Sequence, residues 1–257
     1  MIGRSPLPPE YLEWNRTWGC PYGRGRAAMV SLRERLRAPD AEAYGPFAFQ
    51  PERGLKTFQY PWAYFTADPQ PGMRALISGA GLGGLQFVLA MEGVDVVNVD
   101  PTVAGGSTVE AHARLNDAYG TDVRLIGDLS EAAELPAGSF DRVFLLSTLD
   151  NLGRDAGRAV LSNAADLLAP GGLCLLTSDL LLHLRPFGVL AGGDAERNVD
   201  LYELTKEVGL EMSYGDPREL NGFPEFDPVH VVQALPEIYV GPYYSSASQN
   251  LVLHRPG

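Results

Sequence analysis

The chain has few cysteines, and this limits the classes of protein it can belong to. Its 257 residues include only Cys20 and Cys174, which are far apart in the sequence. A disulfide-stapled small fold is therefore excluded, and a chain of this length buries roughly 70–75% of its unfolded surface without such staples. No apolar signal segment follows the first residues, Met-Ile-Gly-Arg-Ser-Pro, so we expect a reduced, cytoplasmic protein.

Long apolar runs are also missing. The longest, such as residues 143–146 and 180–182, have the length of core strands. A helix that crosses a bilayer needs about 20 apolar residues. We therefore expect a protein without a membrane partner.

Positive charge is scarce as well. Lys and Arg total 20 against 32 Asp and Glu, a net charge of −12. Binding to a phosphate backbone depends on basic side chains, so we expect no nucleic-acid partner. The exception is a group of five arginines on a predicted amphipathic helix over residues 25–38, or just before it. They form either a solvated helix face or an anchor for a carboxylate or phosphate of a small substrate; they are Arg24, Arg26, Arg33, Arg35 and Arg37.

The composition and the hydrophobic pattern of the chain change near residue 72. Residues 1–72 are rich in Pro, Gly and aromatics, whereas strand and helix patterns alternate from residue 73 onward. Strands are predicted at 74–78, 95–99, 122–126, 141–147 and 172–178, and a last one at 250–254. This alternation predicts a doubly wound, mostly parallel, Rossmann-like seven-stranded sheet with an antiparallel C-terminal edge hairpin. We expect two domains, an N-terminal aromatic and helical extension (1–72) and a cofactor-binding domain (73–257).

A glycine loop follows the first predicted strand. Gly79, Gly81 and Gly83 allow a sharp turn that brings backbone N–H groups close to a ligand. Asp100 ends the next strand, nineteen residues after Gly81, where a carboxylate can accept hydrogen bonds from both ribose hydroxyls of an adenosine. The pattern therefore predicts a nucleoside cofactor. The glycines alone do not identify it, because they fit both the dinucleotide fingerprint G-x-G-x-x-G and the shorter loop G-x-G-x-G.

Residues further along the chain distinguish a dinucleotide from another nucleoside cofactor. Asp128 and Leu129 follow the third strand, and the run Leu-Ala-Pro-Gly-Gly occupies residues 168–172. In order and spacing, residues 73 to about 178 resemble the class I S-adenosylmethionine-dependent methyltransferases. The resemblance implies S-adenosyl-L-methionine as the cofactor, with Asp128 accepting from the adenine amino group and Leu129 covering the ring. From the residues alone, Asp128 is also explained as a helix N-cap.

The resemblance implies a set of cofactor-binding residues and has one departure. The family loop usually has an acidic residue two places before its first glycine, where this chain has Ile77. The implied cofactor-binding residues are Gly79, Ala80, Gly81, Gly83, Asp100, Pro101, Asp128, Leu129 and Ser147.

Catalytic candidates follow the fourth and fifth strands, because ligands of open α/β sheets bind beyond the carboxyl ends of the strands. Asp150 is a candidate base, with a helix N-cap as the alternative, and Asn151 beside it is expected to contact the substrate. His183 is the other candidate base, with a packed, partly buried histidine as the alternative. No metal is expected.

Aromatic residues precede the cofactor domain. Tyr60, Trp62 and Tyr64 belong to a dense aromatic run that we expect to fold over the substrate as a lid. The alternative is that part of the run packs in the core.

The sequence and the resemblance therefore predict an S-adenosylmethionine-dependent methyltransferase that acts on a small molecule in a biosynthetic pathway. Three alternatives remain: a cyclase that consumes S-adenosylmethionine and releases methylthioadenosine, an NAD(P)-dependent oxidoreductase, and a nonenzymatic cofactor-binding module. The oligomeric state and the acceptor atom are not predicted.

Overall fold

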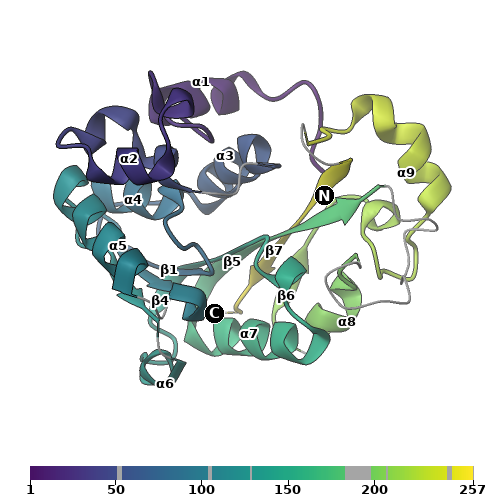
Figure 1. Ribbon diagram of the computed structural model, residues 1–257. Helices are drawn as coiled ribbons and strands as arrows, with labels where there is room; N and C mark the ends of the chain where they lie inside the picture. The colour runs from purple at the N-terminus through teal and green to yellow at the C-terminus, as the bar shows by residue number, and fades with distance from the viewer. Residues whose placement is uncertain are drawn as a thin grey trace. The chain divides into compact units, whose positions relative to one another are not determined.

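A computed structural model of the chain describes residues 1–50, 54–103, 106–127, 129–182, 198–206, 208–241 and 245–256. Its strands are hydrogen-bonded in the order β3-β2-β1-β4-β5-β7-β6 (Figure 1). Strands β1 to β3 pair in parallel, as do β4 and β5, whereas β7 is antiparallel to both β5 and β6. The predicted fold class, a mostly parallel sheet with an antiparallel C-terminal edge hairpin, is confirmed. The strands are β1 (Arg74–Ser78), β2 (Asp95–Val99), β3 (Arg124–Ile126), β4 (Phe140–Leu146), β5 (Leu168–Leu181), β6 (Glu211–Ser213) and β7 (Ser246–His254).

The chain divides into two compact units, Pro8–Pro136 and a second formed by Met1–Leu7 with Ala137–Gly257. The Pro8–Pro136 unit contains helices α1 (Pro9–Trp18), α2 (Leu32–Arg37), α3 (Lys56–Ala67), α4 (Gly84–Met91), α5 (Gly106–Tyr119) and α6 (Leu129–Ala132). It also has short 3₁₀ helices at η1 (Ala27–Met29), η2 (Ala41–Tyr44), η3 (Pro46–Phe49) and η4 (Pro101–Val103). The other unit contains η5 (Leu149–Asn151), α7 (Arg154–Leu167), α8 (Leu201–Thr205), η7 (Pro217–Glu219), α9 (Pro228–Ala234) and η8 (Leu235–Glu237).

The aromatic run before β1 forms helix α3, although Pro61 lies inside it. A proline has no N–H, so the carbonyl of Thr57, four residues earlier, loses its partner within the helix. The side chain of Asn15 on α1 donates to this carbonyl at 2.8 Å. Packing of α1 against α3 therefore lets the helix continue through the proline.

The predicted helix over residues 25–38 is wrong in extent, because it is interrupted. The structure has the 3₁₀ turn η1 and then the short helix α2, which begins after Ser31. Ser31 and Glu34 form a capping box, which starts a new helix at that point. Arg35 is 4% exposed and donates to the carbonyls of Ala27 and Val30, so it holds this turn in place and is not a surface anchor.

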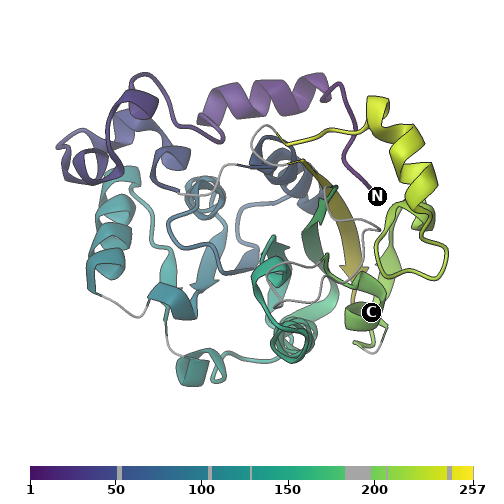
Figure 2. The ribbon, with the colours of Figure 1, turned by 45° about the vertical axis from the view of Figure 1, so that its right-hand side comes forward.

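The second unit is built around the long β5–β7 pair. The register runs from Leu173 opposite His254 to Leu181 opposite Ser246. The first residues of the chain lie beside β7, with a bridge between Ile2 and Gln249 (Figure 2). One core cluster of this unit consists of Ile2, Leu180, Val231, Ile238 and Ala247.

Within the part of the chain that the structure describes, no helix is long and apolar enough to cross a membrane. The same residues include no group of three or more His, Cys, Asp or Glu side chains that could hold a metal ion.

Candidate cofactor site

The loop between β1 and α4 has the backbone conformation that its glycines permit. Gly79 and Gly81 have φ angles of 75° and 50°, in a region that side-chain-bearing residues rarely adopt. The Gly79 N–H donates to the carbonyl of Val99 at 2.9 Å, and the Gly83 N–H donates to the carbonyl of Ala80 at 2.6 Å. The loop is thus a closed turn tied to the end of β2.

The next two glycines are required by packing inside the protein. A Cβ atom on Gly83 would lie 2.8 Å from the Ala80 carbonyl oxygen, and one on Gly84 would lie 2.5 Å from the Phe47 ring. These spacings are too short for a side chain. Gly83 and Gly84 therefore allow helix α4 to start directly behind the turn and against η3.

Two backbone donors of the loop remain for a ligand. Gly84 N–H donates to the Gln50 side chain at 3.3 Å, and Gly81 N–H donates to Asp100. Among the described residues, the N–H groups of Ala80 and Leu82 have no protein acceptor. Backbone donors of this kind at the start of a helix suit the polar groups of a nucleoside cofactor.

Asp100 lies at the end of β2 and is 3% exposed. Its Oδ2 accepts from Gly81 N–H at 2.7 Å, and its Oδ1 accepts from the Thr102 N–H at 2.9 Å and the Thr102 hydroxyl at 2.6 Å. A carboxylate offers about four acceptor positions, so the described residues leave one open on Oδ2. Asp100 thus fits a ribose hydroxyl and also holds the loop. Pro101, which follows it, begins η4 and is exposed.

Three buried polar side chains behind the loop were not predicted from the sequence. Gln86, Asn98 and His112 are at most 3% exposed and lie on α4, β2 and α5. The Gln86 amide donates to the carbonyls of Gly81 at 3.0 Å and Gly83 at 2.9 Å. Burial lowers the pKa of His112 to about 4, so its ring is neutral. Gln86 and Asn98 have a signal in the sequence, because each is an amide within an apolar run, whereas His112 lies in a segment with many polar residues and has none.

Only part of the aromatic run reaches the loop. The hydroxyl oxygen of Tyr60 lies 3.3 Å from the position of a Cβ on Gly83, and the Tyr60 ring packs 5.3 Å from that of Phe47. Tyr60 and Trp62 are 8% and 3% exposed. Tyr64 donates to Glu92 at 3.0 Å, and burial together with this carboxylate raises its pKa to about 12.

The residues after β4 lie in the second unit. Ser147 has a φ of 55°, a strained conformation for a residue with a side chain. Its N–H donates to the Thr177 carbonyl at 3.0 Å and its hydroxyl donates to Asp179 Oδ1 at 3.0 Å. The ends of β4 and β5 are thus tied together through Ser147.

Asp150 is held by β5. Its Oδ1 accepts from the Ser178 hydroxyl at 2.5 Å and from the Asp179 N–H at 3.1 Å. The Asn151 side chain donates to the Ser147 carbonyl at 3.3 Å and is exposed. Two of the predicted site residues therefore brace the turn after β4.

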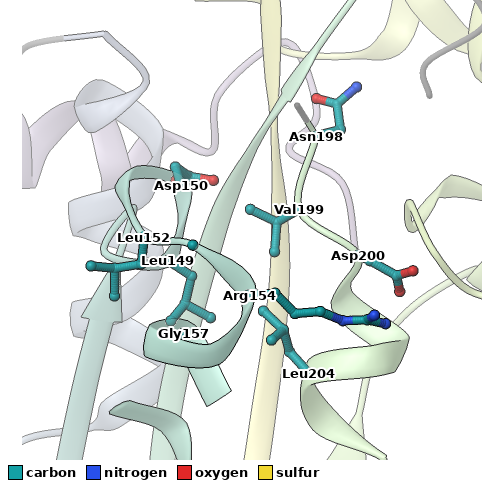
Figure 3. Close-up of a pocket in the computed structure, with 10 residues that line it drawn as sticks. Leu149, Asp150, Leu152, Arg154, Gly157, Asn198, Val199, Asp200 and Leu204 are labelled. Atoms are coloured by element: carbon teal, nitrogen blue, oxygen red, sulfur yellow. The ribbon is translucent and has the colours of Figure 1, made fainter. Parts of the chain in front are cut away.

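A pocket of about 230 Å³ lies beside this turn, within the same unit (Figure 3). Its apolar lining is Leu149, Leu152, Val199 and Leu204. Its polar side chains are Asp150, Arg154, Asn198 and Asp200. Arg154 is paired with Glu203 at 2.8 Å, and Asp150 and Asp200 add two carboxylates to the lining.

Three predicted residues cannot be placed. Asp128, the side chain of Leu129 and His183 lie outside the described residues.

Comparisons with known proteins agree with the predicted family, class of enzyme and methyl donor. Residues 76–176 match the family model described as a methyltransferase domain, a family that uses S-adenosylmethionine as methyl donor. A ubiquinone biosynthesis O-methyltransferase of Bordetella pertussis is 24% identical over 218 residues, which cover 79% of this chain and 86% of that protein.

Solved structures share the fold. Phosphoethanolamine N-methyltransferase 2 of Haemonchus contortus, in complex with S-adenosyl-L-methionine, matches 89% of this chain with a TM-score of 0.53 and 20% identity, and this chain spans 60% of its length. The [4+2]-cyclase SpnF matches 91% of this chain and 98% of its own, with a TM-score of 0.55 and 14% identity. The match to the methyltransferase domain model thus covers residues 76–176, which include the glycine loop and Asp100, and it agrees with the predicted resemblance to the class I S-adenosylmethionine-dependent methyltransferases.

Proposed function

We propose that this protein transfers the methyl group of S-adenosylmethionine to a small-molecule acceptor. The observation that carries the proposal is the loop of residues 79–84, which keeps two N–H donors beside the nearly buried carboxylate of Asp100. This arrangement lies in the segment that matches the methyltransferase family.

The residues of the loop have a binding task. The cofactor supplies an electrophilic methyl group on a sulfonium, and transfer is an in-line displacement that needs alignment and exclusion of water. We assign the N–H groups of Ala80 and Leu82 to polar atoms of the cofactor and the remaining acceptor position of Asp100 to a ribose hydroxyl. Gly79, Gly81 and Gly83 shape the turn, and Pro101, Asp128, Leu129 and Ser147 remain predicted contacts.

Removal of a proton from the acceptor requires a base, and the second unit has carboxylates that are candidates for it. Asp150 and His183 remain the predicted bases, and Asp179 joins them because Ser147 orients its carboxylate. Oδ1 of Asp150 accepts hydrogen bonds from the Ser178 hydroxyl and the Asp179 N–H, which hold its carboxylate in place. The pocket beside Asp150 suits a small, partly apolar acceptor, and Asn151 is the predicted contact next to it.

We further propose that residues 1–72 include a substrate lid, to which Tyr60 belongs through its hydroxyl beside Gly83. Trp62 and Tyr64 contribute to it through packing, since one is buried and the other is paired with Glu92. A biosynthetic role, a cytoplasmic location and the lack of a nucleic-acid partner remain predictions.

A thermal-shift measurement tests the cofactor. A ligand at about 100 times its dissociation constant adds roughly 2.7 kcal/mol of stability, a shift of several degrees in Tm. We expect this shift with S-adenosylmethionine and S-adenosylhomocysteine. A shift with NAD or NADP alone would overturn the proposal in favour of an oxidoreductase.

Product analysis tests the reaction. S-adenosylhomocysteine that forms only when an acceptor is supplied indicates methyl transfer. Methylthioadenosine that forms without an acceptor, above the spontaneous background, indicates that S-adenosylmethionine is itself cyclised. Ligand binding without either product indicates a nonenzymatic binding module.

A further inference from the structure

The three side chains behind the glycine loop form one buried hydrogen-bond network. The Gln86 Oε1 accepts from Asn98 Nδ2 at 2.9 Å and lies 3.0 Å from His112 Nε2. Asn98 Nδ2 also donates to the Gly81 carbonyl at 3.1 Å. The network thus joins α4, β2 and α5 to the loop carbonyls.

Every hydrogen-bonding position of Gln86 is used. Its two amide hydrogens go to the carbonyls of Gly81 and Gly83, and its oxygen accepts from Asn98 and His112. Because that oxygen only accepts, His112 has to carry its proton on Nε2. The neutral, buried ring of His112 is compatible with this role.

The network decides which way two peptide groups point. In a trans peptide the C=O and the following N–H point in opposite directions. Drawing the Gly81 carbonyl toward Gln86 and Asn98 therefore turns the Leu82 N–H away from the network. The Gly83–Gly84 peptide behaves in the same way, since its carbonyl binds Gln86 and its N–H binds Gln50.

No other described side chain is seen to fix the Gly81–Leu82 peptide. Ile77, at the end of β1, is 4% exposed and has no polar atom in its side chain. Asp100 binds the N–H of Gly81, on the preceding peptide group. The orientation of the Leu82 N–H thus depends on Gln86 and Asn98.

We infer that Gln86, fixed by Asn98 and His112, is a positioning residue that keeps the Leu82 N–H turned toward the cofactor. This inference rests on the proposed function, because it assumes that the loop binds S-adenosylmethionine. Without the Gln86 donors, the Gly81–Leu82 peptide is free to rotate, and binding then has to restore its orientation.

Calorimetric titration with S-adenosylhomocysteine tests the inference on the full chain. Gln86→Met keeps the length of the side chain and removes its hydrogen bonds, and we expect affinity to fall at least tenfold. The matched control is Asn116→Ala on α5, because Asn116 binds only Thr121 and Val123 among the described residues. We expect this control to lower Tm while leaving affinity within twofold of the wild type.

A second variant adds a pH readout and serves if Gln86→Met does not fold. Gln86→Glu keeps the shape and can donate to a loop carbonyl only when protonated, and burial raises the pKa of such a carboxyl. We expect its affinity to rise at least fivefold from pH 8 to pH 6, while the wild-type affinity changes less than twofold.

The outcomes separate the two proposals. If the wild type does not bind S-adenosylhomocysteine, the proposed function and this inference are both overturned. If the wild type binds, either of two results overturns only the inference: Gln86 variants with unchanged affinity and no pH dependence, or an equal loss of affinity in Asn116→Ala.

Discussion

Replacing Asp100 with alanine should weaken both the cofactor loop and cofactor binding. The carboxylate accepts from Gly81 N–H and from the N–H and hydroxyl of Thr102. Hydrogen bonds to a charged group contribute about 1.5–3 kcal/mol each. In the variant, water can bind the donors of the half-exposed Gly81 and the exposed Thr102, which reduces the loss of stability. We expect a net loss of about 2–3 kcal/mol in the free energy of unfolding, or roughly 4–12 °C in Tm.

The effect on binding follows from the acceptor position that remains on Asp100. Loss of a charge-assisted hydrogen bond to a ribose hydroxyl costs about 1.5–3 kcal/mol, which corresponds to roughly 10- to 150-fold in the dissociation constant. Calorimetry with S-adenosylhomocysteine measures this loss, and Asp100→Asn, which keeps the size of the side chain, serves as the conservative comparison.

Ligand analogues separate direct contact from loop damage. We compare S-adenosylhomocysteine with its 2′-deoxy and 3′-deoxy forms in both proteins. If Asp100 contacts the ribose, removing the contacted hydroxyl costs the wild type affinity and costs Asp100→Ala almost none. Equal penalties in the two proteins, or a variant with wild-type affinity and Tm, would refute the reasoning.

Three further predictions concern stability. Ser147→Gly should melt roughly 2–4 °C above Ser147→Ala. Both variants lack the hydroxyl, but only glycine adopts a φ of 55° without strain, a difference of about 1 kcal/mol. Equal melting temperatures would contradict the strain at Ser147. The folded-state pKa of His112 is about 4, below an unfolded value near 6.5, so the unfolded chain binds more protons between these values. This pKa difference contributes up to about 3 kcal/mol to the free energy of unfolding, and the contribution is present above pH 6.5 and lost as pH falls toward 4. Urea titrations of the wild type and of His112→Gln at several pH values check this. If the free energy of unfolding of the variant depended on pH as steeply as that of the wild type, the result would count against the prediction. Tyr60→Ala should cost roughly 3 kcal/mol or more because Tyr60 is 8% exposed, and a variant that melts like the wild type would contradict a supporting role of its buried ring.

Local patterns were sufficient for the fold class and for part of the site. The alternation of strands and helices after residue 73 and the glycine loop before α4 depend on residues close in sequence, and the structure has both. The edge hairpin was also expected, although β7 begins at Ser246, earlier than predicted, and the short strand β6 was not among the predicted strands.

Local patterns failed where a distant contact decided the outcome. Helix α3 continues through Pro61 because Asn15 satisfies the exposed carbonyl. The alternative that Asp150 is the helix N-cap is wrong, because α7 begins after Gly153 and Asp150 accepts from Ser178 and Asp179 on the next strand. Neither partner can be inferred from spacing along the chain.

The sequence by itself determined the alternation of strands and helices after residue 73, the sharp turn at Gly79 and Gly81, and the position of Asp100 at the end of β2, because backbone preferences and hydrophobic periodicity act over a few residues. Only the tertiary structure decided what these groups do. In the structure Asp100 binds the N–H of Gly81 and keeps one acceptor position for a ligand, and His112 lies beside Gln86, 26 residues away in the sequence. Such contacts depend on which faces of the helices and strands are buried together. The direction of each hydrogen bond behind the loop is therefore a property of the packed protein.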